Sequence, residues 1–451
     1  MPAIAGASGR LRAQRLRFNL FVAFAFTIMA DPVSSVAYAL EAPLSALDGD
    51  LESLFPTMAL VVGVIALVAA GYHGLIARFP NGGGGAEGVA AAFGEGWAFL
   101  PLGALVVDFT LTVSVSCAAG ASALIAYVPD LADLRVPIAV GLVLAVGAAT
   151  LLGHRARLLF ATATLGFVGA TLVVIVLGAG AQPAPRHVPV VGDASFLPML
   201  LALPLGMALA TGVEAPSNAV AQLGQLGERG RRLFGQLTLW LMVVIVGCLT
   251  LSLAALAVRL GVGAPAADST LLADTARSAT GGGAVFAVFQ AASALLLLAA
   301  AASSYLAGSG LLEALAAHGA DGEGLLPRRF RLTNKSYVPP WGVAVIAGVS
   351  VVLVTATGGH EQSLVHYYAA AVFASFFAAL LASTVLCRRE RRRLPTITGA
   401  AGTLAVALVL VLNLRRFDPV VSLTAAGLIS LYLWRTWVAR GRPGSVGRIV
   451  A

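Results

Sequence analysis

Long apolar segments alternate with short polar ones along almost the whole chain. A membrane-spanning helix needs about 20 mostly apolar residues in a row. Segments of that kind lie near residues 17–44, 57–77, 98–128, 136–153, 157–179, 197–223, 233–260, 284–316, 341–358, 364–387, 395–413 and 419–438. The pattern predicts an all-α polytopic membrane protein with about twelve transmembrane helices.

The same pattern predicts the organisation of the chain. Residues 17–387 form the expected membrane core, and residues 388–438 add two further transmembrane helices. Residues 1–16 and 439–451 are expected to be short terminal segments. Residues 10–30 imitate a signal peptide, but the apolar run continues to about Leu44 and more spans follow, so we interpret it as a retained first helix.

Composition supports the bilayer as the solvent of this chain. Its residues are 59% hydrophobic and only 11% charged, whereas soluble domains carry about 25% charged residues. The net charge of +8 does not indicate a nucleic-acid partner, because the arginines gather in short loops between apolar runs. Three scattered cysteines, Cys117, Cys248 and Cys387, predict neither a disulfide framework nor a metal site.

Loop charges predict the orientation. Basic residues fall in the N-terminal segment and in alternate loops, at Arg155/Arg157, Arg229/Arg231/Arg232, Arg328/Arg329/Arg331/Lys335, Arg388–Arg393 and Arg440/Arg442. The intervening loops carry Asp48, Asp50, Glu52, Asp130, Asp133, Asp193, Asp268 and Asp274. Positive loops stay inside, so we expect a multi-pass protein of the cytoplasmic (inner) membrane with both termini cytoplasmic.

Two spans contain helix-breaking sequences. Residues 30–35 read Ala-Asp-Pro-Val-Ser-Ser in the first span, and residues 210–216 read Ala-Thr-Gly-Val-Glu-Ala-Pro in the sixth. Irregular backbone inside a membrane is tolerated only where it lines a cavity or lies in the protein interior. The first and sixth helices correspond if residues 17–179 and 197–387 form two repeats, and paired broken helices mark the binding site of inverted-repeat transporters. We expect unwinding near residues 31–34 and 210–213.

Three carboxylates lie within predicted spans, at Asp31, Asp108 and Glu214. Each costs about 2.5–3.5 kcal/mol at the centre of a membrane helix. No lysine or arginine lies at comparable depth to pair with them. They must therefore be protonated, face water or hold a cation; the structural alternative is a protonated carboxyl hydrogen-bonded to a neighbouring helix.

Asp108, Thr112 and Ser116 recur every four residues in the third span. That spacing places one carboxylate and two hydroxyls on one helix face, and hard cations prefer such oxygen ligands. Packing of small polar residues between helices would explain the two hydroxyls alone. With Asp108 on the same face, the pattern favours a cation site.

Further candidates flank the breaks. Tyr38 follows Asp31 by seven residues, and Thr211 precedes Glu214 by three. Taken alone, Tyr38 is equally typical of a membrane-interface tyrosine. Tyr368 in the tenth span is a weaker candidate, and Glu41 is a candidate vestibule residue only.

No enzyme is predicted. Gly83, Gly85 and Gly88 match the spacing of a dinucleotide fingerprint, but they follow a membrane helix rather than a strand, so a turn leading into a helix is expected. The sequence offers no set of nucleophile, base and orienting residue, and no cofactor is expected.

Four motifs together resemble those of bacterial K+ uptake permeases of the KUP/KimA type. They are Asp-Pro-Val-Ser-Ser-Val-Ala-Tyr-Ala at 31–39, Phe-Pro-Asn-Gly-Gly-Gly at 79–84, Val-Asp-Phe-Thr-Leu-Thr-Val-Ser-Val-Ser at 107–116 and Ala-Thr-Gly-Val-Glu-Ala-Pro-Ser-Asn at 210–218. The resemblance spans most of residues 17–387. It implies the amino acid–polyamine–organocation superfamily, with a LeuT-like 5+5 inverted repeat and K+ uptake coupled to protons. Many such permeases carry a soluble nucleotide-binding domain, and none is predicted here, which leaves regulation and oligomeric state open.

The resemblance also implies a site. Its K+ ligands would be Asp31, Tyr38, Asp108, Thr112, Ser116 and Thr211, with Glu214 and Tyr368 beside them and Asp31 or Glu214 carrying the proton. An amino acid or polyamine permease is the alternative, although a charged Asp31 at the first break would repel a substrate carboxylate. A membrane sensor that transports nothing is the alternative from another class, and the absence of a predicted signalling domain disfavours it.

Overall fold

The computed structural model describes residues 18–153, 157–182, 196–318 and 324–449. The expected terminal segment 1–16, Arg155 and Asp193 lie outside the described residues. The described part of the chain is helical and contains no strand, which confirms the all-α class. Its α-helices are Phe18–Ile28, α2 (Ala30–Ser34), α3 (Glu41–Ala46), α4 (Leu51–Arg78), α5 (Gly84–Phe93), α6 (Phe99–Tyr127), α7 (Arg135–Thr150), α8 (Arg157–Gly180), α9 (Phe196–Gly206), α10 (Ala215–Ala219), α11 (Glu228–Leu260), α12 (Leu271–Thr280), α13 (Gly283–Ala317), α14 (Pro340–Ala356), α15 (Glu361–Arg389), α16 (Arg393–Asn413) and α17 (Phe417–Ala439).

Short 3₁₀ segments join several of these helices. They are η1 (Ser35–Ala37), η2 (Glu95–Ala98), η3 (Pro129–Leu134), η5 (Met207–Ala210), η6 (Val220–Gln222), η8 (Arg328–Arg331) and η9 (Val446–Arg448). α5 begins directly after a turn at the end of α4, as expected for the glycine-rich sequence around Gly83.

Within the described residues, ten helices are long and apolar enough to cross a membrane, or eleven if the bent first pair is one span. The polytopic architecture is therefore confirmed, but not the count of about twelve. The expected span at 341–358 corresponds to α14, which has only 17 residues. At about 1.5 Å per residue such a helix is about 25 Å long, shorter than the hydrocarbon core of about 30 Å.

The first span bends by 52° between Phe18–Ile28 and Ala30–Ala37. The expected unwinding at residues 31–34 is wrong in position, because Ala30–Ser34 is helical. The bend precedes this stretch, at Met29, and the helix tightens to 3₁₀ geometry after it. Pro32 lies in the first turn of α2, where a missing N–H costs nothing, so the proline starts a helix here rather than unwinding one.

The sixth span is broken at residues 211–214, between η5 and α10, close to the expected 210–213. Gly212 adopts the left-handed conformation, with φ of +72°. A Cβ at Gly212 would lie 2.9 Å from Cδ of Pro32 and 3.0 Å from Oδ2 of Asp31. Ser35 also donates a hydrogen bond to the Leu209 carbonyl, at 3.4 Å. The two breaks therefore meet in the interior of the protein.

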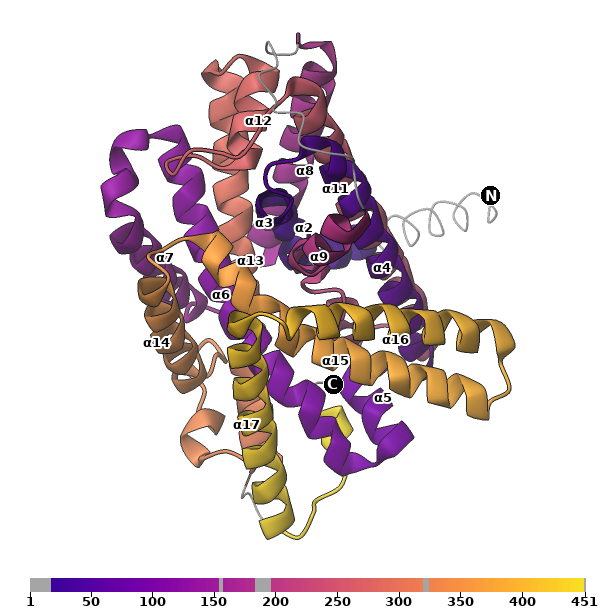
Figure 1. The fold of residues 1–451 in the computed structure, drawn as a ribbon. Helices are drawn as coiled ribbons and strands as arrows, with labels where there is room; N and C mark the ends of the chain where they lie inside the picture. The colour runs from indigo at the N-terminus through magenta and orange to yellow at the C-terminus, as the bar shows by residue number, and fades with distance from the viewer. Residues whose placement is uncertain (1–17, 154–156, 183–195, 319–323, 450–451) are drawn as a thin grey trace, which may run out of the picture.

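α6 is the central helix of the bundle. It packs against α7, α13, α14, α15 and α17, and 83% of its most apolar stretch is buried inside the protein. The corresponding fractions are 28% for α16 and 22% for α17, which lie at the periphery (Figure 1). Side chains of α6 are thus shielded from lipid on almost every face.

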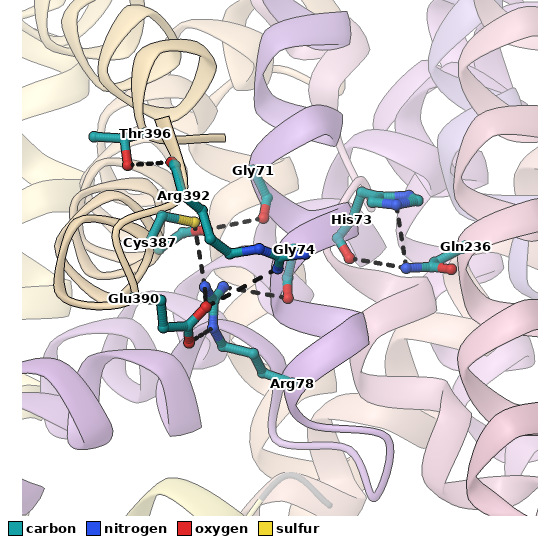
Figure 2. A network of polar contacts seen from close by, with 10 residues as sticks. Gly71, His73, Gly74, Arg78, Gln236, Cys387, Glu390, Arg392 and Thr396 are labelled. Carbon is teal, nitrogen blue, oxygen red and sulfur yellow. Dashed lines mark hydrogen bonds and ion pairs between the residues drawn. The ribbon is translucent and has the colours of Figure 1, made fainter. Parts of the chain in front are cut away.

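A polar network ties the ends of α4 and α15 together (Figure 2). Arg78 donates to both carboxylate oxygens of Glu390, at 2.9 and 2.8 Å, and to Sγ of Cys387 at 3.2 Å. A bidentate arginine–carboxylate pair fixes geometry as well as charge. In the same view, the Gln236 amide of α11 contacts His73 of α4, 3.2 Å from its Nε2. α4 is therefore held from two sides.

Candidate cation site at the two helix breaks

Asp31 and Glu214 lie at the two breaks. Asp31 belongs to α2, and Glu214 is the residue directly before α10. Both side chains are buried, and both line one cavity in the middle of the bundle. The positive φ of Gly212 allows the backbone of the sixth span to approach Asp31, so the two carboxyls come from different spans to one place.

Asp108 of α6 completes a group of three carboxyls. Its Oδ1 accepts a hydrogen bond from the Tyr368 hydroxyl of α15, and its carboxyl lies near that of Glu214. Asp31 is close enough to Asp108 for their charges to repel. The structure thus brings together four of the predicted residues, from the first, third, sixth and tenth expected spans.

Four buried oxygens of predicted site residues have no hydrogen-bond partner in the protein. They are Oδ1 of Asp31, Oγ1 of Thr112, Oγ of Ser116 and Oε2 of Glu214. Buried polar atoms normally have a hydrogen-bond partner, so a buried atom without one in the protein is expected to bind a ligand, a water or an ion. Oxygens are also the ligands that hard cations prefer. These unpartnered atoms are therefore of the ligand type that a hard cation uses.

Tyr38 and Thr211 lie together beside this cluster. The Tyr38 side chain is buried next to the hydroxyls of Thr211 and Ser34, and its carbonyl accepts from Gln362 of α15 at 3.3 Å. Thr211 donates to the Ala208 carbonyl at 2.6 Å, so its oxygen lone pairs remain free to accept. Ser116 is buried in α6 and lies two turns beyond Asp108 on the same helix face.

The cavity at Asp31 and Glu214 has a volume of about 350 Å³. It runs between α2, α10 and α13 toward Gln222, Ala314 and Ile449, which lie beside loops rich in arginine. Asp108 is not among the lining residues but is near Glu214, which is. Two of the three carboxyls therefore line the cavity, and the third, with its tyrosine, lies outside the lining.

No basic side chain neutralises the cluster. Across the part of the chain that the structure describes, none of the ion pairs involves Asp31, Asp108 or Glu214. In the same part, no three His, Cys, Asp or Glu side chains are placed to hold a metal ion together. Three neighbouring buried carboxyls cannot all be ionised without a compensating charge. The site therefore requires protons, a cation or both, and a cation would need hydroxyl oxygens among its ligands.

Two further residues belong to the site, and sequence reasoning missed both. Tyr72 of α4 is fully buried and near Glu214 and Asp108. Ser304 of α13 lines the cavity with a hydroxyl that has no partner. The signals for them were a tyrosine inside the second apolar run and the serine pair 303–304 inside the eighth.

A second buried polar cluster, also missed, lies at the opposite end of α6. Arg135 forms an ion pair with Glu361 at 3.9 Å, and Ser122 donates to Oε2 of Glu361 at 2.5 Å. The second amino group of Arg135 donates to the Ala267 carbonyl, at 2.6 Å. Arg135 and Glu361 lie just before the predicted apolar runs 136–153 and 364–387 and resemble loop charges in the sequence, so no sequence pattern distinguishes them.

Glu41, the candidate vestibule residue, has a structural role in the described molecule. Its carboxylate accepts a hydrogen bond from the Leu271 backbone N–H at 3.1 Å, which links α3 to the start of α12. Burial, and repulsion from Glu361, raise the pKa of Glu41 to about 7. It is thus a half-buried carboxyl with a backbone donor as its partner.

Comparisons with known proteins agree with this architecture. The family model described as amino acid permease matches residues 18–433. The potassium transporter KimA of Bacillus subtilis (strain 168) is 30% identical over 353 residues, which are 75% of this chain and 56% of that protein. The chain therefore spans little more than half the length of this relative.

Proposed function

The chain belongs to the amino acid permease family, and from that premise we propose that it imports K+ across the cytoplasmic membrane together with protons. The observation that carries this proposal is the meeting of Asp31, Asp108 and Glu214, without a basic partner, beside buried oxygens that lack hydrogen bonds. The likeness to a potassium transporter supports the choice of ion.

The proposed K+ ligands combine charge with neutral oxygens. Asp31 and Asp108 supply charge, and Tyr38, Thr112, Ser116 and Thr211 supply neutral oxygens. K+ gives up most of its hydration shell on entering, and the carboxylates compensate for that loss. Tyr368 keeps one oxygen of Asp108 occupied by a hydrogen bond, which leaves the other directed to the ion.

Proton coupling follows from crowding of the carboxyls. Glu214 and Asp108 are neighbouring buried carboxyls, so ionising both is unfavourable and one of them is suited to hold a proton. Import of both together requires the proton and the cation to be bound at the same time, and three neighbouring carboxyls allow this because one can hold the proton while the others face the cation. We propose Asp31 or Glu214 as the proton carrier, because both border the cavity through which a proton can leave.

The proposed orientation puts both termini and the arginine-rich loops in the cytoplasm. The cavity that Gln222 and Ile449 line would then be the exit route of the ion. The membrane potential assists inward movement of one charge by about 2.3 kcal/mol per 100 mV.

The test is uptake by purified protein in proteoliposomes. We expect accumulation of K+, or of Rb+ as its tracer, that slows when the proton gradient is collapsed. Uptake of K+ that ignores the proton gradient would leave a uniporter. Uptake of an amino acid or polyamine with which K+ does not compete would replace the proposal by the permease alternative.

A further inference from the structure

The segment that follows α17 folds back into the protein. Figure 1 shows the yellow C-terminal end of the chain returning to lie beside α5. η9, at Val446–Arg448, contacts both α5 and η2. Val446 is completely buried and belongs to a small apolar core with residues of α5, α6 and α17. The segment 443–449, which we name the C-terminal strap, is therefore packed rather than free in solvent.

Polar contacts fasten the strap at two acidic residues. The backbone N–H groups of Ser445 and Gly447 each donate to one carboxylate oxygen of Glu95, both at 3.2 Å. Arg448 forms an ion pair with Glu87 of α5 at 3.2 Å. A carboxylate that receives two backbone donors holds a segment in one register.

Gly447 shows how closely the strap approaches α5. A Cβ at this position would lie 2.8 Å from the Cα of Glu87 and 2.9 Å from the Cβ of Ala90. Both atoms are fixed by the helix, so a larger side chain cannot be accommodated while the strap stays docked. Gly444, three residues earlier, has no atom within 4 Å of the corresponding Cβ position.

The strap reaches the central cavity. Ile449 lines the same cavity as Asp31 and Glu214, as do Ala314 and Gln222. Its side chain is buried, with 8% exposure. An apolar side chain at the mouth of a pathway narrows it and excludes water from the carboxyls beyond.

We propose that the C-terminal strap is a releasable cover on the mouth of the cavity, which restricts passage between the carboxyl site and the arginine-rich side. Its Arg448–Glu87 anchor is suited to release, because the Arg448 side chain is 70% exposed and ion pairs open to solvent contribute little to stability. This role rests on the proposed function in one respect, because it takes the cavity to be the transport route.

Accessibility of a cysteine inside the cavity tests the proposal without any transport assay. Ala307→Cys places a thiol on the α13 wall of the cavity, in full-length protein with Cys248→Ala and Cys387→Ala. Reconstituted into nanodiscs, this protein is labelled with a charged maleimide and the rate is followed by mass spectrometry. Gly447→Val should displace the strap and raise the labelling rate about fivefold or more, whereas Gly444→Val should leave it unchanged.

Controls separate release of the strap from unfolding. Cys117 is buried and lies outside the cavity lining, so its labelling should stay slow in every variant. Glu95→Ala removes the two carboxylate oxygens that accept from the strap's backbone N–H groups, without adding bulk, and it should also accelerate labelling of the cavity thiol. Equal labelling rates for Gly447→Val, Glu95→Ala and Gly444→Val would overturn the proposal. If Gly447→Val and Glu95→Ala are labelled faster but the protein does not transport K+, the proposed function is refuted while the covering role of the strap is retained.

Discussion

The central carboxyl cluster and the Arg135 cluster lie beside opposite halves of α6. Both contain buried carboxyls, but the two clusters compensate the cost of burial differently. Glu361 is buried, but it has an arginine and a serine hydroxyl as partners. Asp31 and Glu214 are equally buried, yet each has an oxygen with no partner and neither has a basic neighbour. A paired buried charge is compensated within the protein itself. An unpaired buried carboxyl requires a proton or a cation that comes from solution.

This difference separates structural from functional polar groups. Burial alone does not distinguish them, because Glu361 and Asp108 are almost equally shielded from solvent. The presence or absence of a basic partner does distinguish them. Substitutions in the Arg135 cluster should therefore change folding stability, and substitutions in the central carboxyl cluster should change transport.

The largest effect is expected for Asp108→Asn. The amide keeps the shape of the side chain but removes a buried charge that would hold the ion, a loss of about 3–5 kcal/mol. K+ uptake should fall by about a hundredfold or more while the amount of folded protein is retained. Cys117→Ala, on the same buried helix, is the matched control and should transport K+ at close to the normal rate. Normal uptake by Asp108→Asn would show that this face of α6 does not bind the ion.

The next effect should appear in stability rather than in transport. Arg135→Met leaves Glu361 buried without its counter-charge, which should destabilise the folded protein by about 3 kcal/mol. Thermal unfolding in detergent measures the change. The double variant Arg135→Met/Glu361→Leu removes both charges and should recover most of the lost stability. If the double variant is no more stable than the single one, Glu361 does not depend on Arg135.

Thr112→Val deletes one unpaired oxygen and keeps the size of the side chain. Because a neutral ligand contributes about 1 kcal/mol, the apparent affinity for K+ should fall about fivefold with an unchanged maximal rate. The concentration dependence of Rb+ uptake gives both quantities. Thr110→Val is the matched control, since the Thr110 hydroxyl already donates to the Val106 carbonyl at 2.8 Å. An equal loss of affinity in both variants would assign the effect to packing.

The smallest effect concerns Glu41, which is intermediate between the two clusters because its partner is a backbone N–H. Its pKa in the folded protein, about 7, lies above the ordinary value of 4.5. Protonation therefore favours the folded state, and its stabilising effect is present below about pH 4.5 and lost as the pH rises to about 7. The melting temperature relative to Glu41→Gln should accordingly drop by about 2 °C from pH 5 to pH 8. Parallel pH profiles for the two proteins would contradict this account.

The sequence predicted the class of fold and the centre of the site for one physical reason. A carboxylate in an apolar run is costly wherever the run is placed, so Asp31, Asp108 and Glu214 stand out from the amino-acid pattern alone. The structure brings these three together with Tyr368, and their roles in binding remain a proposal. The position of the first break was mispredicted because Pro32 can begin a helix as well as interrupt one.

Other parts of the site could not be found from sequence patterns. Tyr72 and Ser304 are ordinary residues for a membrane helix, and only packing decides whether their hydroxyls face lipid, another helix or a cavity. The partnership of Arg135 with Glu361 joins residues more than two hundred positions apart. The C-terminal strap likewise depends on the close approach of Gly447 to α5, a distance that no local pattern encodes.

The shortness of α14 has a consequence for the surrounding lipid. The adjacent α13 has 35 residues, about twice the number in α14, so one side of the protein offers the bilayer two very different apolar lengths. Trp341, half exposed at the start of α14, carries Arg329 5.6 Å from its ring centre, and such aromatic and basic side chains anchor helices at the lipid headgroups. Lipids next to α14 must thin to match it, or the longer helices must tilt. The length of the lipid acyl chains, which sets the thickness of the membrane, should therefore affect the tilt of the helices around α14.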